Sequence, residues 1–306
     1  MSNLLTRILA NKRDDVARAK AERPLQELIR KIKDTPKPRS FKTALTTPDF
    51  GIIAEIKKKS PSRADMNPVN VQDAPEAYRD CKIVKAVSIL TDWAFFGMTV
   101  TDLQNLKGIV QKPVLRKDFI FDEYQVYEAR AFGADAILLM ACLPVSRRQL
   151  RTLFDLASEL GMDVLCEVHS VAELRRAPDK ATIYGVNSRQ FQTSEGSVRY
   201  RASRILGSFS RFWSAPARAD LSTDLSVFER LIRELPKGCV KVAESGLSPS
   251  RIQDIRSLGF DSALIGTSLL QDSSGVRHAL NEFAHALGQA QAEQTDAGTA
   301  ALPATA

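Results

Sequence analysis

Side chains that can transfer protons stand at the ends of several short apolar runs of the chain. Glu55 and Lys57 lie at the end of one run, and Lys117 and Glu167 lie at the ends of two others. Amino and carboxyl groups act as general acids and bases when a fold holds them close to a substrate. Further polar residues end the other runs: Thr91, Asp92, Asp118, Asn187, Arg189, Glu244 and Ser245. If the runs are strands whose ends meet, the sequence predicts an active site there.

Glycines after the last two runs indicate a phosphate site. Gly246 follows one run, Gly266 and Thr267 follow the other, and a short helix is expected at 268–271. Glycine lets the backbone approach an anion closely, and a helix N-terminus favours negative charge. The nucleotide-binding patterns G-x-G-x-x-G and G-x-x-x-x-G-K-[ST] are absent from the sequence. We therefore expect a phosphorylated small molecule rather than a nucleotide.

Eight apolar runs predict the strands that position these groups. They cover residues 51–56, 83–90, 114–115, 136–140, 163–166, 184–186, 240–243 and 263–265. Their nearly continuous hydrophobicity is typical of parallel strands, and amphipathic helical patterns lie between most of them. The pattern predicts a single α/β domain, a (β/α)8 TIM barrel, whose strand ends converge on one mouth. An open doubly wound sheet is the competing arrangement, because a strand count does not establish closure.

The remaining segments flank or interrupt this barrel. Residues 1–45 predict a helical extension in which Pro24 separates two helices, with 41–45 leading into the first strand, and residues 46–287 predict the barrel. Residues 192–221 read as an insertion after the sixth strand, with five arginines and one glutamate. A surface elaboration is the favoured interpretation of this insertion, and a lid or partner surface is the alternative. Residues 288–306 are expected to be disordered.

The composition excludes several other classes of protein. The net charge of +7 is dispersed and does not interleave with aromatic residues, which argues against nucleic-acid binding. The longest apolar stretch is too short to span a bilayer, and the four cysteines are scattered as in a reducing cytoplasm. The three histidines are also scattered, so we expect no metal. The expected protein is a cytoplasmic monomer that binds a small anionic substrate.

Ordered motifs give the chain a specific resemblance. The segment Glu55-Ile56-Lys57-Lys58-Lys59-Ser60-Pro61-Ser62 is similar to the E-x-K-(R/K)-x-S-P-S signature of indole-3-glycerol-phosphate synthases. Further segments match in order: Leu115-Arg116-Lys117-Asp118-Phe119, Glu167-Val168-His169, Asn187-Ser188-Arg189 and Glu244-Ser245-Gly246. The resemblance covers about residues 4–288 apart from the insertion. It implies a TIM barrel and a cofactor-free lyase of tryptophan biosynthesis.

That family converts 1-(2-carboxyphenylamino)-1-deoxyribulose 5-phosphate into indole-3-glycerol phosphate, with release of carbon dioxide and water. The resemblance makes Lys117 the general acid for ring closure, with a pKa expected to be lowered by nearby positive charge or burial. It makes Glu167 and Lys57 the candidates for the acid and the base of the dehydration step. It leaves open how the acid and base roles are divided between Lys57 and Lys117. Glu55 and Asn187 are expected to orient the lysines and the substrate, with Glu244 and Ser245 in support.

The two anionic ends and the ring of that substrate need separate contacts. Gly246, Gly266 and Thr267, helped by Lys57, are expected at the phosphate. Arg189 and Ser60 are expected at the carboxylate. An apolar slot for the aromatic ring is expected from Pro61, Phe96, Phe119 and Leu264.

Departures from the family pattern leave alternatives open. Ala64 and Met98 stand where the family usually has Gly, and Gln190 and Phe191 replace an acid and a smaller residue. These changes and the insertion are expected to crowd one side of the mouth. A paralogue with another substrate preference, a sugar-phosphate isomerase and a regulatory or binding protein are the alternative hypotheses.

Overall fold

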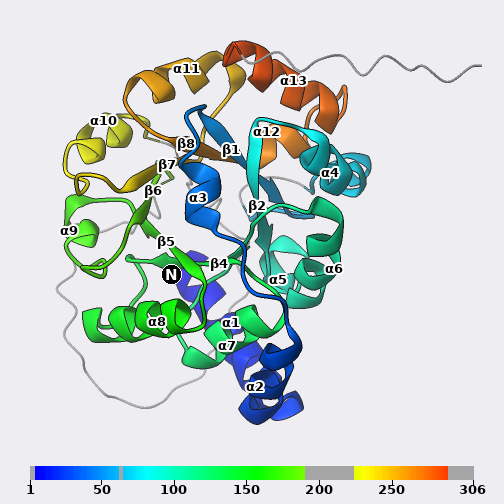
Figure 1. Ribbon diagram of the computed structural model, residues 1–306, viewed down its shortest axis with the longest axis vertical. Coiled ribbons are helices and arrows are strands. Elements are labelled where there is room, and N and C mark those ends of the chain that lie inside the picture. Colours follow the sequence, from blue (N-terminus) through cyan, green and yellow to red (C-terminus); the bar gives the residue numbers. More distant parts are fainter. Residues whose placement is uncertain (1–3, 62–64, 190–223, 289–306) are drawn as a thin grey trace, which may run out of the picture.

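Eight parallel strands pair in chain order, and the last pairs with the first. The computed structural model describes residues 4–61, 65–189 and 224–288. The strands are β1 (Gly51–Ile56), β2 (Val84–Leu90), β3 (Val114–Lys117), β4 (Ala136–Met140), β5 (Asp163–Val168), β6 (Ile183–Asn187), β7 (Val240–Glu244) and β8 (Ser262–Ile265). Because β8 pairs with β1 from Gly51–Ser262 to Ala54–Ile265, the sheet is a closed barrel (Figure 1). Closure confirms the predicted TIM barrel and rules out the open sheet.

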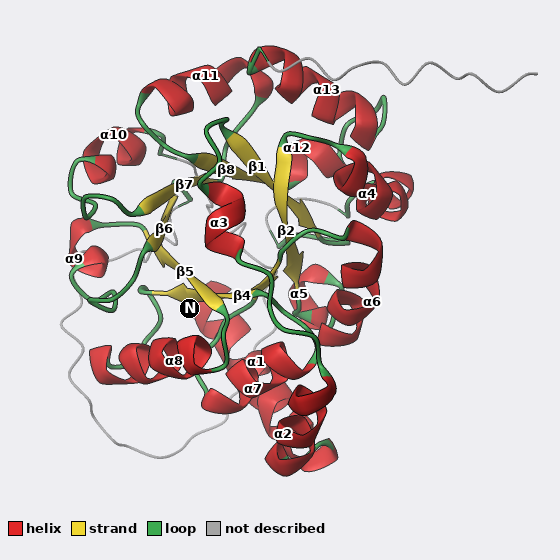
Figure 2. Ribbon diagram, in the orientation of Figure 1, coloured by secondary structure: helices red, strands yellow, loops and turns green. Residues whose placement is uncertain are grey.

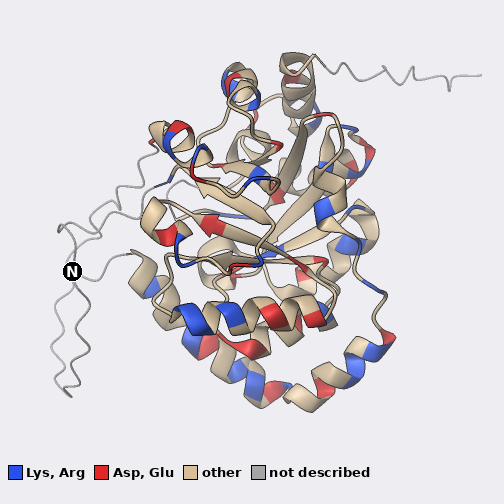
Figure 3. Ribbon diagram, turned by 60° about the vertical axis from the view of Figure 1, so that its left-hand side comes forward, with Lys and Arg blue, Asp and Glu red and all other residues tan. Residues whose placement is uncertain are grey.

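Helices surround the ring of strands on its outer side (Figure 2). The larger ones that follow strands are α4 (Pro68–Asp80), α6 (Val100–Val110), α7 (Glu123–Ala131), α8 (Arg147–Glu159), α10 (Ser226–Ile232), α11 (Pro249–Ser257) and α13 (Val276–Ala286). The short ones are α5 (Trp93–Phe96), α9 (Val171–Leu174) and α12 (Thr267–Leu270). Several outer helices carry both basic and acidic residues (Figure 3), as the dispersed charge of the sequence predicts. None of the described helices is long and apolar enough to cross a membrane.

The strands separate two apolar cores because successive side chains point to opposite faces. Ile53, Leu115 and Leu165 pack inside the barrel. Ile52, Val164 and their outward-facing neighbours pack against the surrounding helices. The polar residues at the strand ends therefore rest on an apolar floor inside the barrel.

Three helices precede β1. Pro24 separates α1 (Leu4–Glu22) from α2 (Leu25–Asp34), as predicted. Residues Phe41–Leu45, expected to end the helical extension and lead into the first strand, form the short helix α3, which lies over the centre of the ring (Figure 2). The backbone N–H of Lys42 donates to Asp163, the first residue of β5, at 2.8 Å. This contact places α3 at the N-terminal end of the barrel, opposite the mouth.

Candidate active site

A lysine and two glutamates from three different strands meet inside the barrel mouth. Lys117 ends β3, Glu167 lies near the end of β5, and Glu244 ends β7. Lys117 Nζ donates to Glu167 Oε2 at 2.7 Å and to Glu244 Oε2 at 2.8 Å. Both carboxylates are buried, and only 12% of the lysine side chain is exposed. One ammonium group is thus shared by two carboxylates.

A second lysine–glutamate pair comes from β1. Glu55 and Lys57 are two residues apart at the strand end, so their side chains point to the same face. Lys57 Nζ lies 2.5 Å from Glu55 Oε1, and both side chains are buried. Glu55 also contributes to the field at Lys117. The two pairs therefore form one continuous group of proton-transfer residues.

The carboxylates set the charge of Lys117. Burial lowers the pKa of Lys117, but Glu167, Glu244 and Glu55 outweigh burial and raise that pKa above its ordinary value. The expectation of a lowered pKa was wrong, because acids rather than bases surround the amine. Lys117 is accordingly a full ammonium at neutral pH, which is the form a general acid requires.

The two glutamates differ in their affinity for a proton. Burial raises the pKa of Glu167, but the charges of Lys117 and His169 outweigh it and lower the pKa to about 2. Burial raises the pKa of Glu244 to about 7, with Lys117 opposing the rise and Glu167 adding to it. Two carboxylates beside one cation thus favour one ionised partner and one that can hold a proton near neutral pH.

Two glycines leave room for the carboxylates. A Cβ added to Gly185, on β6, would overlap a carboxylate oxygen of Glu244. A Cβ added to Gly266, after β8, would overlap the carboxylate of Glu55. Gly266 was predicted as a phosphate contact, and the structure adds a steric reason for glycine there. Gly185 was not predicted, since a glycine within a strand carries no signal about a distant side chain.

A pocket of about 1010 Å³ opens over these groups. It is lined by most of the predicted site residues: Glu55, Lys57, Phe96, Lys117, Phe119, Glu167, Asn187, Arg189, Glu244, Ser245, Gly246, Leu264, Gly266 and Thr267. Ser60 and Pro61 are not among its lining residues in the described ranges. Ser268 and Gln271, from the short helix expected at the phosphate site, also line it, and so does Ser248, which was not predicted.

The pocket wall has an apolar side and a cationic side. Phe96 and Phe119 stack with ring centroids 6.4 Å apart and an interplanar angle of 29°. Across the pocket, Asn187 Oδ1 accepts the backbone N–H of Arg189 at 2.9 Å. Nε of Arg189 is buried and has no hydrogen-bond partner among the described residues. A flat apolar group and an anionic oxygen can both be accommodated here.

Other predicted strand-end residues serve the packing of α1. Lys12 Nζ lies 2.9 Å from Asp92 and 2.8 Å from Asp118. Asp118 also accepts from Thr91 at 2.7 Å and from Arg116 at 2.9 Å. These buried charges attach α1 to the ends of β2 and β3. Sequence reasoning missed Lys12, because a lysine in an N-terminal helix is ordinarily a surface residue.

The comparisons with known proteins agree with this geometry. Residues 5–206 match the family described as Indole-3-glycerol phosphate synthase. The chain belongs to the indole-3-glycerol phosphate synthase family. An indole-3-glycerol phosphate synthase from Bacteroides thetaiotaomicron is 35% identical over 275 residues, covering 89% of this chain and 94% of that protein. An indole-3-glycerol phosphate synthase from Leptospira interrogans is 35% identical over 286 residues, which cover 92% of this chain and 97% of that protein.

A solved structure supports the fold alone. The 3-hexulose-6-phosphate synthase of Salmonella typhimurium superimposes with a TM-score of 0.53 at 13% identity. The match covers 79% of this chain and 100% of that one. Because the identity is so low, it supports the barrel architecture and carries no argument about substrate.

One departure from the indole-3-glycerol phosphate synthase pattern does not crowd the mouth. Met98 was expected to narrow it, but its side chain is 1% exposed and packs in the core between strands and helices. Gly97 before it has φ +74°, which supplies the left-handed turn that ends α5. Ala64, Gln190, Phe191 and the arginine-rich insertion lie outside the described residues.

Proposed function

We propose that the protein is an indole-3-glycerol phosphate synthase of tryptophan biosynthesis. It would convert 1-(2-carboxyphenylamino)-1-deoxyribulose 5-phosphate to indole-3-glycerol phosphate, carbon dioxide and water. The observation that carries the proposal is the Lys117–Glu167–Glu244 cluster beside Lys57–Glu55, in a pocket of a family member. The proposal treats the protein as a cytoplasmic monomer with one barrel domain, residues 46–287, and a helical extension, residues 1–45.

The first chemical step needs a proton donor at the ketose oxygen. As the ring carbon that carries the carboxylate attacks the ketose carbon, that oxygen gains negative charge. The Lys117 ammonium supplies the proton, and the ring regains aromaticity when carbon dioxide leaves. Glu167 and Glu244 hold the ammonium in place before transfer. A positioned general acid of this kind contributes about 10²–10⁴-fold to a rate.

Dehydration then needs a base and an acid. Glu167 is ionised at neutral pH, and its carboxylate accepts the proton that the ring nitrogen gives up as the hydroxyl group leaves. The hydroxyl group leaves as water after protonation by an ammonium group, that of Lys57 or, once solvent has restored the proton given up in ring closure, that of Lys117. Glu55 holds Lys57 in the pocket for this role, and Asn187 and Ser245 orient the substrate.

The phosphate, the carboxylate and the aromatic ring of the substrate are assigned to residues of the pocket wall. Gly246, Gly266 and Thr267 line one end, where α12 begins without a side-chain cap. Uncapped N–H groups there are available to a phosphate. Arg189 and Ser60 are assigned to the carboxylate. The aromatic ring is assigned to the apolar slot of Phe96, Phe119, Leu264 and Pro61.

Incubation of the purified protein with the substrate tests the proposal. We expect stoichiometric release of carbon dioxide and a product with indole fluorescence and the mass of indole-3-glycerol phosphate. A folded protein that yields neither would contradict it. A panel of sugar phosphates in the same experiment distinguishes the isomerase alternative.

A further inference from the structure

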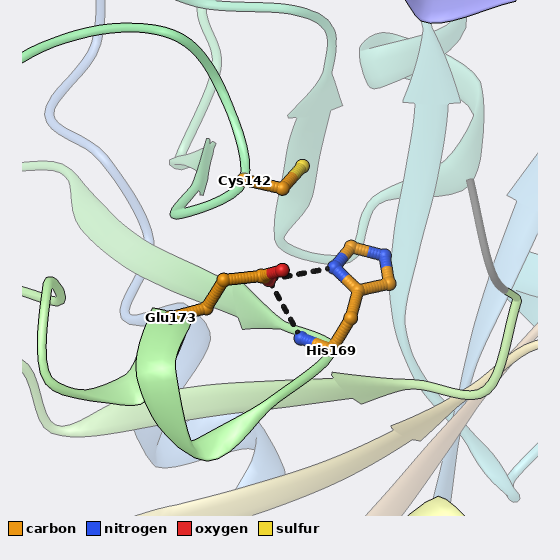
Figure 4. A group of neighbouring side chains, drawn as sticks. All are labelled: Cys142, His169 and Glu173. Atoms are coloured by element: carbon orange, nitrogen blue, oxygen red, sulfur yellow. Dashed lines mark hydrogen bonds and ion pairs between the residues drawn. The ribbon is translucent and has the colours of Figure 1, made fainter. Parts of the chain in front are cut away.

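Cys142 meets His169 and Glu173, which lie about thirty residues further along the chain, and the three bring ligand-type atoms together beside the active site. Cys142 lies in the turn after β4, His169 follows β5 directly, and Glu173 belongs to α9 (Figure 4). The thiol, the imidazole and the carboxylate each place a ligand atom within 4.8 Å of the other two. The expectation that the histidines are too scattered to join a ligand set therefore fails for His169.

Hydrogen bonds connect the turn after β4 with the segment that follows β5 and includes α9. The backbone N–H of Ala141 donates to the carbonyl of Glu167 at 3.0 Å, which aligns the ends of β4 and β5. Arg176 follows α9 and donates to the carbonyls of Leu143 and Val145 at 3.1 and 2.6 Å. The turn that carries Cys142 is thus held against the segment that carries His169 and Glu173.

The three ligand types select for a cation of intermediate softness. Zn²⁺ is bound by thiolate, imidazole and carboxylate at about 2.0–2.3 Å, whereas Mg²⁺ and Ca²⁺ require oxygen ligands. Only 11% of the His169 side chain and 21% of the Glu173 side chain are exposed, so the site is sheltered yet reachable. Three protein ligands leave a fourth tetrahedral position for water.

The second ring nitrogen of His169 lies on the side of a carboxylate. Nδ1 lies 2.9 Å from Glu173 Oε2, on the side of the cluster. Nε2 lies 3.4 Å from Glu167 Oε1. Histidines that bind a metal through one ring nitrogen commonly turn the other toward a carboxylate, which fixes the ring. Glu167 is the carboxylate nearest that nitrogen here, at an ion-pair distance without a hydrogen bond.

We propose that Cys142 Sγ, His169 Nδ1 and a Glu173 carboxylate oxygen form a Zn²⁺ site. Binding displaces the thiol proton of Cys142 and the Nδ1 proton of His169 to solvent, and small side-chain rotations bring the three atoms to bonding distance. The Glu173–His169 hydrogen bond is replaced by shared ligation of the ion. The site is separate from the substrate pocket, whose described lining includes none of its three residues.

Cobalt titration of the untagged full chain tests the site without any measurement of activity. All four cysteines and all three histidines of the sequence lie in the described ranges, so the candidate ligands are known. We expect one Co²⁺ per chain with a thiolate-to-cobalt charge-transfer band in the near ultraviolet. Stoichiometric Zn²⁺ should abolish the band, and millimolar Mg²⁺ should leave it unchanged.

Matched variants assign the band to its ligands. Cys142→Ser should remove the band, and Glu173→Gln should weaken Co²⁺ binding at least tenfold. The control Cys239→Ser alters another cysteine and should keep the wild-type spectrum. Absence of the band in the folded wild type, or its persistence in Cys142→Ser, would overturn the proposal. Because the readout is spectroscopic, it remains decisive whether or not the proposed reaction is found.

Discussion

The ammonium nitrogen of Lys117 lies 2.7 Å from a carboxylate oxygen of Glu167, and 50 residues separate the two in the chain. The contact joins β3 to β5 across the barrel interior. It holds an acid and a base within reach of one substrate, and it keeps the lysine charged.

Replacement of Lys117 by alanine should lower kcat by about 10²–10⁴-fold, because the proton donor for ring closure is lost. Steady-state rates of indole-3-glycerol phosphate formation measure the effect. Lys180→Ala is the matched control, since Lys180 is 80% exposed and makes only a surface ion pair among the described residues. A Lys117→Ala variant with the wild-type kcat would show that Lys117 is not the proton donor for ring closure.

Glu167→Gln should lower kcat by a similar factor with a smaller effect on KM. The amide keeps the shape of the side chain but cannot accept the proton from the ring nitrogen. Separate kcat and KM values from initial rates distinguish this from a loss of binding. Glu159→Gln, on the exposed end of α8, should behave as the wild type. A rise in KM with unchanged kcat would assign Glu167 to binding alone.

Gly185→Ala should impair catalysis more than folding. The added methyl group overlaps the Glu244 carboxylate, the movable end of a side chain, so the strand can remain while the carboxylate leaves Lys117. We expect at least a tenfold loss of kcat. Gly108→Ala is the control, because a Cβ there meets nothing within 4 Å and replaces glycine in a helix. It should gain up to about 1 kcal/mol of stability at unchanged kcat.

Glu244 should make stability depend on pH between 4.5 and about 7. Its folded pKa is about 7, above the ordinary value of 4.5, so the native state binds a proton more tightly than the unfolded chain. This contribution is complete below pH 4.5 and is lost as pH rises through about 7, at up to about 1.4 kcal/mol per pH unit.

Urea unfolding at pH 5 and pH 8 measures this dependence. The free energy of unfolding should fall more over this interval in the wild type than in Glu244→Gln. Glu159→Gln again serves as the control and should follow the wild type. Parallel changes in the wild type and the Glu244 variant would show that Glu244 titrates alike in both states.

Lys12→Met should destabilise the fold by about 3–5 kcal/mol. Its removal leaves Asp92 and Asp118 buried without the cation that joins them, and an uncompensated buried charge is costly. Lys20→Met is the matched control on the same helix. Lys20 pairs with Asp122 at 2.7 Å but is 46% exposed, so its loss should cost at most about 1 kcal/mol. Equal losses of unfolding free energy in the two variants would refute this reading of the buried network.

The sequence by itself determined the strands, their order and the residues at their ends. Apolar runs such as 51–56 and 136–140 match β1 and β4 because local hydrophobicity decides which short segments are buried on both faces. It also indicated that Glu55, Lys117, Glu167 and Glu244 belong to one site, since parallel strands end at the same rim.

Only the tertiary structure decided which of these charges pair and what each pair does. Barrel closure and strand register place Lys117 between two carboxylates and so reverse the expected direction of its pKa shift. The same folding brings Lys12 to Asp118 and Cys142 to His169, contacts that span 106 and 27 residues. Electrostatic energy depends on distances of a few ångströms and on burial, and neither quantity is encoded in the local pattern of residues.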